Sequence, residues 1–452
     1  MSSTSVPIII IGGGIGGLST ALALHATGFK DIHIFEAVKE IRALGVGINV
    51  QPSAVLILRN WGLLSRLEKI GRETEELRMF NRHGNYIMSE PLGRHAGYTI
   101  PQYSVHRGEF QMLLLEAVKE RIGEDRVHLS HVFTSFEQDD DGITAHFTRA
   151  RDSTEPAEIP SMTGAFLVAA DGINSATRRL LYPDEGPPLF SGRMLWRGCL
   201  ETADPRLWDT PLTWCGNADQ RFIVYPITGP RGASGKALVN WIAELRTRSR
   251  EEVARDAAPP VRSDWTARVD KAAFAPSFKG WVCGPGGLRP EELVGLTPDD
   301  CVFEFPMCDR EPVARWSFGR LTLLGDAAHA MYPTGANGAT QAIIDAETLG
   351  GFLERQVGGS ARPDWAAALA GYQDQRLPAT AQIVRVNRST GPDSVLQMVE
   401  DRAPDGFEVI QDVCSKEELE GVGLRYKTLT HALKDIVNEK AKLTESLAER
   451  FN

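Results

Sequence analysis

Glycine and acidic residues recur in this chain at spacings that suit the binding of a phosphate-containing ligand. In the first motif, Gly12-Gly13-Gly14-Ile15-Gly16-Gly17, three glycines (Gly12, Gly14 and Gly17) stand at GxGxxG spacing. Glycine at these places permits a tight turn, close approach of backbone amides to a pyrophosphate, and tight packing of a helix on a strand. The motif predicts a dinucleotide site, and alone it does not separate FAD from NAD.

The segments on both sides of this motif are those needed to position it. Val6 to Ile11 is a continuous apolar run typical of a parallel strand buried on both faces, and Leu18 to Ala26 predicts a helix. A second strand, Asp31 to Phe35, ends in Glu36, whose carboxylate could accept hydrogen bonds from an adenosine ribose. A glycine-rich turn without a ligand is the weaker interpretation, because strand, helix and terminal acid are all present.

A second motif follows another apolar strand, Ala165 to Ala170. Asp171-Gly172 ends that strand, and Ser175 and Arg178 complete a DGxxSxxR pattern. The turn could bring a carboxylate and a guanidinium to a cofactor. An ordinary strand-end turn with an Asx hydrogen bond is an equally good interpretation of the residues alone.

A third motif, Gly325-Asp326, ends the strand Leu321 to Leu324, and Asp326 could bind the hydroxyls of a ribityl chain. The loop Met331 to Gly338 then leads into a helix over Ala339 to Phe352. Amides at such a helix start stabilise an anion, as a reduced flavin is. His329, beside this motif, is interpreted as structural because a lone histidine without a visible partner is weak evidence of catalysis.

These motifs, with four further segments, give the chain a family resemblance from about Val6 to Arg388. It resembles the group A (single-component) FAD-dependent aromatic monooxygenases, which have the 4-hydroxybenzoate hydroxylase fold. Within that group it is most similar to the salicylate and 3-hydroxybenzoate hydroxylases, and closest to the phenazine-carboxylate monooxygenase branch. The further segments are Leu44 to Pro52, Pro101 to Gly108, Leu195-Trp-Arg-Gly198 and Met331 to Gly338.

The resemblance implies FAD as cofactor, with NADPH or NADH as a transiently bound co-substrate. It implies that Gly12 to Gly17 hold the pyrophosphate, that Asp326 holds the ribityl chain, and that Asp171 and Arg178 lie near FAD and the nicotinamide. The implied cofactor-binding residues are Gly12, Gly14, Ile15, Gly17, Glu36, Arg42, Gly45, Val46, Gly47, Arg107, Asp171, Arg178, Asp326, Gly335, Asn337, Gly338 and Ala339. Since Gly284-Pro-Gly-Gly287 lacks GxGxxG spacing, no separate nicotinamide domain is expected.

Two residues in the substrate segment are candidate catalytic residues. Arg197 lies in a mostly apolar strand, where it could receive a substrate carboxylate or phenolate, or could form a structural ion pair. Tyr225, at the end of the strand Phe222 to Pro226, could donate or relay a proton at the substrate hydroxyl, or could be a packed core tyrosine. The resemblance favours the catalytic interpretation of both.

The reaction that the resemblance implies consumes NAD(P)H and O2 and hydroxylates a phenolic or aromatic carboxylic acid through a C4a-hydroperoxyflavin. Decarboxylation accompanies hydroxylation where the attacked carbon carries a carboxylate. The alternative is a flavin-binding protein or oxidoreductase without hydroxylase activity. The substrate, the position hydroxylated and the preferred nicotinamide stay open.

The expected fold is α/β: a Rossmann-like FAD-binding domain, an antiparallel β-sheet substrate domain and C-terminal helices. The expected division gives 1–76, 104–182 and 286–390 to the FAD-binding domain, 77–103 and 183–285 to the substrate domain, and 391–452 to a helical tail. In that tail Ile436, Leu443, Leu447 and Phe451 fall on one helical face, for docking on the body, a dimer contact or a cover for the substrate entrance.

Composition limits the partners. The net charge of −10 over 452 residues argues against nucleic acid and anionic membranes, and no apolar run is long enough to span a bilayer. Six scattered cysteines and ten histidines show no metal-ligand spacing, so no metal site is expected, and reduced thiols favour a cytoplasmic location. The expected partners are therefore a small aromatic substrate, O2 and, in a homodimer, a second copy.

Overall fold

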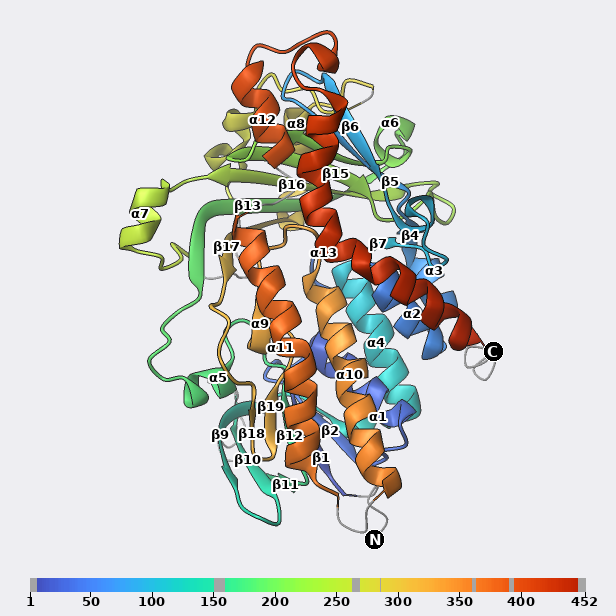
Figure 1. Ribbon diagram of the computed structural model, residues 1–452, viewed down its shortest axis with the longest axis vertical. Helices are drawn as coiled ribbons and strands as arrows, with labels where there is room; N and C mark the ends of the chain where they lie inside the picture. Colours follow the sequence, from blue (N-terminus) through green and yellow to red (C-terminus); the bar gives the residue numbers. More distant parts are fainter. Residues whose placement is uncertain are drawn as a thin grey trace.

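The computed structural model describes residues 6–149, 159–261, 269–284, 286–359, 363–389 and 394–445, and two large sheets dominate it (Figure 1). The six-stranded sheet has the order β18-β19-β12-β1-β2-β8, and its pairings are parallel except for the antiparallel edge pair β18–β19. Its strands are β1 (Ile8–Ile11), β2 (Ile32–Phe35), β8 (Val127–His128), β12 (Leu167–Ala169), β18 (Ser317–Phe318) and β19 (Leu321–Leu323).

Local sequence predicts the strands and helix of this Rossmann-like unit well. All four isoleucines of β1 are buried, as expected of a parallel strand covered on both faces. The first helix begins three residues earlier than predicted, at Ile15, because the glycine motif itself supplies its N-terminal turn. The glycine turn after β1, the turn after β12 and Gly325-Asp326 after β19 therefore meet at the same edge of the sheet, where a parallel sheet binds its ligands.

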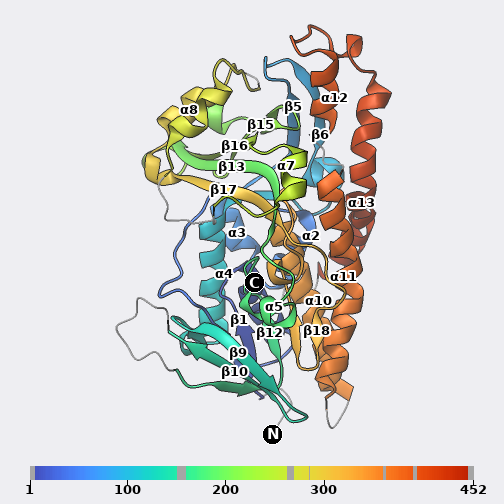
Figure 2. The same cartoon turned by 90° about the vertical axis from the view of Figure 1, so that its left-hand side faces the viewer.

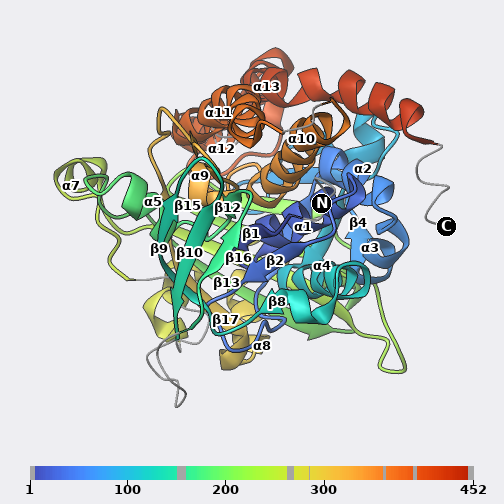
Figure 3. The same cartoon turned by 90° about the horizontal axis from the view of Figure 1, so that it is seen from below.

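Helices and a small sheet cover the two faces of the parallel sheet. Figure 3 shows α1, α4 and α10 gathered on one side of β1 and β2, and the three-stranded sheet β11-β10-β9 on the other. The small sheet consists of β9 (Val132–Gln138), β10 (Ile143–Thr148) and β11 (Met162–Gly164). The helices of the chain as far as α11 are α1 (Ile15–Ala26), α2 (Pro52–Asn60), α3 (Leu64–Ile70), α4 (Arg107–Arg121), α5 (Ala176–Leu181), α6 (Pro205–Trp208), α7 (Arg250–Arg255), α8 (Pro290–Leu296), α9 (Asp326–His329), α10 (Gly338–Gly359) and α11 (Trp365–Ser389).

The second large sheet has seven strands in the order β17-β13-β16-β15-β14-β5-β6, antiparallel apart from the pair β14–β5. Figure 2 shows it above the parallel sheet, with α11 and α13 along one side of both. Its strands are β5 (Glu76–Phe80), β6 (Tyr86–Pro91), β13 (Leu189–Thr202), β14 (Leu212–Gly216), β15 (Gln220–Pro226), β16 (Ala237–Arg246) and β17 (Val302–Asp309). A third small sheet, β3-β7-β4, contains β3 (Gly47–Val50), β4 (Gly71–Glu73) and β7 (Tyr103–His106).

Strand register in the seven-stranded sheet sets one row of side chains side by side. Arg197 on β13 is opposite Ile242 on β16, which is opposite Ile223 on β15, which is opposite Trp214 on β14. Since side chains alternate between the two faces of a sheet, this row faces one way, together with Tyr225 two residues beyond Ile223. The row faces the ligand-binding edge of the parallel sheet.

The C-terminal helices are α12 (Ser394–Arg402) and α13 (Lys416–Leu443). The two described residues of the predicted apolar face do not dock on the body, because Ile436 is 55% exposed and Leu443 is 73% exposed; the dimer contact stays a prediction. Val437 and Ala441 are buried instead, because the helix is rotated so that its small side chains face the body. Leu447 and Phe451 lie outside the described residues. No helix within the described ranges is long and apolar enough to cross a membrane.

Candidate active site

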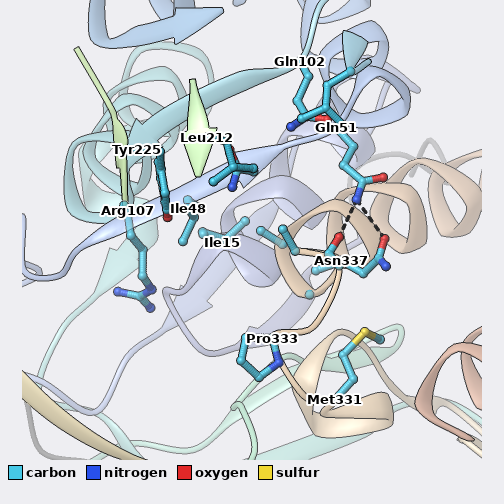
Figure 4. Close-up of a pocket in the computed structure, with 18 of the residues that line it drawn as sticks. Ile15, Ile48, Gln51, Gln102, Arg107, Leu212, Tyr225, Met331, Pro333 and Asn337 are labelled. Atoms are coloured by element: carbon cyan, nitrogen blue, oxygen red, sulfur yellow. Dashed lines mark hydrogen bonds between the residues drawn. The ribbon is translucent and has the colours of Figure 1, made fainter. Parts of the chain in front are cut away.

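A cavity of about 520 Å³ lies where the glycine turns of the parallel sheet face the inner row of the seven-stranded sheet. Segments that are distant in sequence line it: the start of α1, strand β3, the loop before α10, and strands β14, β15 and β16. Figure 4 shows side chains from these segments pointing into one space. The cavity is large enough for a cofactor ring and an organic substrate together.

The first glycine motif forms a turn that fits a pyrophosphate. Gly12 has a φ of +105°, and a Cβ there would lie 2.4 Å from the carbonyl oxygen of Ala170. Gly17 packs against the carbonyl oxygen of Gly12, so both glycines shape the turn and do not line the cavity. Gly14, by contrast, lines the cavity and has open space where a Cβ would lie, so a ligand can approach its backbone. Ile15 and Gly16 also line it.

Glu36 lies beside this turn, as the sequence predicts. Its carboxylate accepts hydrogen bonds from the amide of Gly13, at 2.6 Å, and from the amide of Val38, at 3.0 Å. The acid thus fixes the glycine turn and remains next to the place where the adenosine end of a dinucleotide would lie.

The segment from Arg42 to Gly47 is more structural than predicted. Arg42 is exposed and pairs with Glu40 at 2.6 Å, away from the cavity. The carbonyl oxygen of Gly45 accepts a hydrogen bond from the His106 ring, and that of Val46 accepts one from the amide of Arg107. These contacts position the start of α4, while in this segment Gly47 itself lines the cavity.

Arg107 and Asp326 bring opposite charges to the cavity. Burial lowers the pKa of Arg107, while Asp326 opposes that change and Arg197 adds to it. Burial among protein atoms raises the pKa of Asp326, although His329 and Arg107 lower it, and its carboxylate is accessible through the cavity. A carboxylate there can accept hydrogen bonds from hydroxyl groups, and the guanidinium can bind phosphate or ribose oxygens.

The loop before α10 is held in place by a residue that sequence analysis missed. The side-chain amide of Gln51 donates to the carbonyl oxygen of Gly335, at 2.8 Å, and to the Oδ1 of Asn337, at 3.2 Å (Figure 4). Gly335, Asn337, Gly338 and Ala339 all line the cavity, as do Met331 and Pro333. Gln51 lies in the segment Leu44 to Pro52, which contributes to the family resemblance, but the neighbouring residues do not indicate its long-range partners.

Asp171 and Arg178 are both hydrogen-bonded within the protein, and neither lines the cavity, so their role towards the cofactor stays a prediction. Asp171 accepts hydrogen bonds from the hydroxyl of Ser175, at 2.5 Å, and from the amide and hydroxyl of Thr177, at 3.0 and 3.1 Å, so its carboxylate fixes the start of α5. Arg178 is only 1% exposed and does not line the cavity. Its guanidinium donates to Glu185, to the carbonyl oxygens of Ala327 and Ala328, and to that of Glu311. Arg178 therefore supports α9, the short helix that begins with Asp326.

His329 has a structural role, as predicted from the sequence. Its hydrogen-bond partner, which the sequence did not indicate, is Asp345. His329 is 2% exposed, and its Nε2 lies 2.5 Å from Asp345 on α10. Asp345 also accepts from Arg376, at 2.7 Å, and from the amide of Gly325, at 3.2 Å. Burial raises the pKa of Asp345, but His329 and Arg376 outweigh it and lower the pKa to about 2. The Asp345 carboxylate thus fixes the turn at Gly325 through the hydrogen bond from the Gly325 amide.

Arg197 and Tyr225 lie together in the cavity lining. The Nη2 of Arg197 donates to the carbonyl oxygen of Gly47, at 2.7 Å, while its buried Nε–H has no hydrogen-bond partner among the described residues. Tyr225 is 3% exposed, and burial raises its pKa well above the usual value although contact with Arg197 lowers it. Figure 4 shows the Tyr225 side chain directed into the cavity beside Ile48. Arg197 thus offers an unsatisfied donor, and Tyr225 a neutral hydroxyl, to one ligand.

The remaining wall around these two groups is apolar, and most of it was not predicted. Its residues come from four strands of the seven-stranded sheet, β5, β14, β15 and β16; they are Leu77, Leu212, Trp214, Ile223 and Ile242. Strand alternation could have indicated Ile223 and Ile242 once Tyr225 was chosen, since they lie on its face. At the far end the cavity reaches Tyr98 and Gln102.

Comparison with known proteins gives one consistent result. A family model described as an FAD binding domain matches residues 5–277 and 306–387. The chain is 39% identical to phenazine 1,6-dicarboxylic acid hydroxylase of Lysobacter antibioticus, over 86% of this chain and 90% of that protein. It is 31% identical to a 3-amino-4-hydroxybenzoate 2-monooxygenase of Streptomyces platensis, over 91% of this chain and 96% of that protein.

Solved structures show the same fold. The crystal structure of Klebsiella pneumoniae HpxO with FAD and uric acid covers 100% of this chain and 97% of its own, with a TM-score of 0.67 and 23% identity. At that identity the match supports the fold alone.

Proposed function

The chain belongs to the FAD binding domain family and is a group A flavoprotein aromatic monooxygenase, and from this premise we propose that it hydroxylates a planar aromatic carboxylic acid of the phenazine type. When bound, FAD supplies the redox chemistry, taking electrons from NAD(P)H and activating O2. The protein binds and positions the reactants in the cavity between the two large sheets.

The donor set of the cavity supports the proposed cofactor positions. The open backbone at Gly14 and the start of α1 suit a pyrophosphate, and Asp326 with Arg107 suits the ribityl chain and its neighbours. The amides at Asn337, Gly338 and Ala339 begin a long helix, so they suit the electron-rich edge of the ring. Arg178, which is internally satisfied, is left out of this proposed set.

We propose that Arg197 binds the substrate carboxylate and that Tyr225 donates a hydrogen bond to a substrate oxygen. The observation that carries this assignment is that Arg197 lines the cavity beside Tyr225, while its buried Nε–H has no acceptor among the described residues. A buried donor is costly unless a ligand satisfies it, and a guanidinium binds a carboxylate through two donors. With its raised pKa, Tyr225 stays protonated at neutral pH and acts as a donor, not as a base.

The apolar wall supports a flat substrate with more than one ring. Leu77, Leu212, Trp214, Ile223 and Ile242 form a continuous surface beside Arg197, and the space continues as far as Gln102. The higher identity to the phenazine 1,6-dicarboxylic acid hydroxylase than to the aminohydroxybenzoate enzyme favours the same class. Closure of an apolar wall around the ring would also exclude water from the reacting atoms.

The test is a panel of phenazine carboxylates and hydroxybenzoates, read by NAD(P)H consumption and product mass. We expect phenazine carboxylates to accelerate NAD(P)H consumption and to yield a product with one added oxygen, with or without loss of CO2. The same assay with NADH and NADPH identifies the preferred reductant. Acceleration by hydroxybenzoates only would contradict the proposed substrate, while leaving the monooxygenase class intact.

We also propose a two-domain division close to the predicted one. Strand β17 (Val302–Asp309) pairs with β13, so the segment as far as Asp309 is better assigned to the substrate domain than to the FAD-binding domain. Limited proteolysis followed by mass mapping of the fragments would test this boundary.

We also propose a cytoplasmic location and a homodimer. All six cysteines are free thiols, as expected in a reducing compartment. The exposed Ile436 and Leu443 give the tail apolar surface that a second copy could cover. Light scattering of the holoenzyme measures the oligomeric state directly.

A further inference from the structure

The C-terminal segment 394–445 lies beyond the matched family model, which ends at residue 387. Its two helices nevertheless run beside the substrate sheet and continue down to the cofactor half of the molecule (Figure 1). The role of this segment is therefore not explained by the family match.

Helix α12 and the connection after it complete the hydrophobic cluster behind the apolar cavity wall. Val395, Leu396 and Val399 are buried in the same cluster as Leu212, Trp214 and Ile223. Gln397 also accepts a hydrogen bond from the amide of Ala218, at 3.1 Å, just beyond β14. The segment thus supports the wall from outside the cavity.

Helix α13 holds a second part of the cavity lining, the turn 93–99. Asn438 accepts a hydrogen bond from the amide of Thr99, at 2.8 Å, and donates one to the carbonyl oxygen of Gly97, at 3.0 Å. One helical turn earlier, the Lys434 side chain lies over Gly97, which has a φ of +89°. Three residues of this turn, Gly93, Ala96 and Tyr98, line the cavity.

The end of α13 is in turn fixed to the cofactor half. The Nη2 of Arg59 on α2 donates to the carbonyl oxygen of Ala441, at 2.9 Å, and to the hydroxyl of Thr444, at 3.1 Å. Lys440 pairs with Glu347 on α10 at 3.1 Å. The helix therefore ties the turn 93–99 to the same elements that present the flavin site.

We propose that the C-terminal segment positions the substrate, and that Asn438 is the positioning residue, because it fixes the turn 93–99 as the far wall of the cavity. This inference rests on the proposed use of the cavity by an aromatic carboxylate. Arg94 also anchors the turn, through Glu73 at 2.7 Å, and on the α13 side the hydrogen bonds of Asn438 hold the turn in place.

The test compares Asn438→Ala and Asn438→Asp with Glu439→Ala, an exposed neighbour on the same helix that does not contact the turn. All three should purify with FAD bound. Asn438→Ala loses three hydrogen bonds, one of them from the Thr99 hydroxyl at 3.2 Å. This loss should raise the KM for phenazine-1,6-dicarboxylate about tenfold with little change in kcat, whereas Glu439→Ala should match wild type. Asn438→Asp keeps the acceptor for Thr99 and should lie between them. More H2O2 per NAD(P)H is also expected in Asn438→Ala, because a loosened wall admits water.

Two readouts need no substrate, so they separate this inference from the proposed function. Hydrogen exchange at the Thr99 amide and quenching of flavin fluorescence by iodide should both rise in Asn438→Ala and not in Glu439→Ala. If wild type ignores phenazine-1,6-dicarboxylate while both readouts rise, the proposed substrate is wrong and the wall is still held by Asn438. Unchanged iodide quenching, or a lower melting temperature with an unchanged KM, would overturn the inference.

Discussion

Arg197 combines a fixed guanidinium group with a place in the cavity lining. One guanidinium nitrogen is fixed on the carbonyl oxygen of Gly47, and the side chain lines the cavity beside Tyr225. Arg178, by comparison, donates to Glu185 and to backbone carbonyl oxygens and does not line the cavity. This contrast distinguishes Arg178, which supports the fold, from Arg197, which is placed to bind a ligand in the cavity.

Replacement of Arg197 by alanine should weaken substrate binding and leave FAD in place. A charge-assisted hydrogen bond contributes about 1.5–3 kcal/mol, so the substrate Kd should rise roughly 10- to 100-fold. The measurement is a titration of the flavin absorbance with phenazine carboxylate. Arg231→Ala is the matched control, since Arg231 is a partly exposed arginine that pairs with Glu109 outside the cavity. Equal Kd values for wild type and Arg197→Ala would remove Arg197 from the site.

Replacement of Tyr225 by phenylalanine tests whether the hydroxyl is a donor. The ring keeps its packing, so the fold and FAD content should persist, while kcat should fall about 100-fold if the hydroxyl assists proton transfer. Because burial raises the pKa of Tyr225, its ionisation should not appear in the pH–rate profile of wild type below about pH 10. A basic limb below that pH that disappears in Tyr225→Phe would instead identify the ionised tyrosine as a base.

At the scale of elements, the sequence predicts those strands, turns and helices whose formation depends on consecutive residues. The apolar run of β1, the glycine turn and the start of α1 are all visible in consecutive residues, as are β15 and β16. Pairings between distant segments are not visible in consecutive residues. Strand β17 pairs with β13 across more than a hundred residues, and the Gln51 side chain bonds to the loop before α10. Asp345, the partner of His329, falls in a helix whose local pattern gives no sign of a buried charge.

Helix α10 is coupled to the turn that carries Asp326 through the buried Asp345. Replacement by asparagine removes one member of a buried ionic cluster with His329 and Arg376, which should cost about 3–5 kcal/mol of unfolding free energy. Urea unfolding at neutral pH measures this loss. Glu120→Gln is the control, because its partner Arg66 and Glu120 itself are both exposed and such a pair contributes about 0–1 kcal/mol.

The same carboxylate sets a pH dependence of stability. The folded pKa of Asp345 is lowered to about 2 from an ordinary 3.8, so its contribution is present above the ordinary value and is lost as pH falls towards 2. The difference in unfolding free energy between wild type and Asp345→Asn should therefore be constant near neutral pH and narrow below about pH 4. A difference that grows on acidification would contradict this sign.

At the scale of the whole molecule, the cavity proposed for the cofactor lies where the two large sheets meet. Backbone from the parallel sheet, the loop before α10 and the inner row of the seven-stranded sheet line a single cavity. Ligand bound there contacts both halves and is absent from the unfolded chain. Binding of FAD should therefore stabilise the molecule as a unit.

Removal of FAD should lower the melting temperature, and its return should restore it. At a free concentration 100 times Kd, a ligand that binds only the folded state adds about 2.7 kcal/mol. FMN at the same concentration should add less, because it lacks the adenosine phosphate half that the glycine turn and Glu36 are built to hold. Calorimetry of the apoprotein with each flavin measures both effects. Equal stabilisation by FMN and FAD would mean that the glycine turn at Gly12 to Gly17 contributes nothing to binding, and that the flavin ring and Asp326 carry the whole affinity.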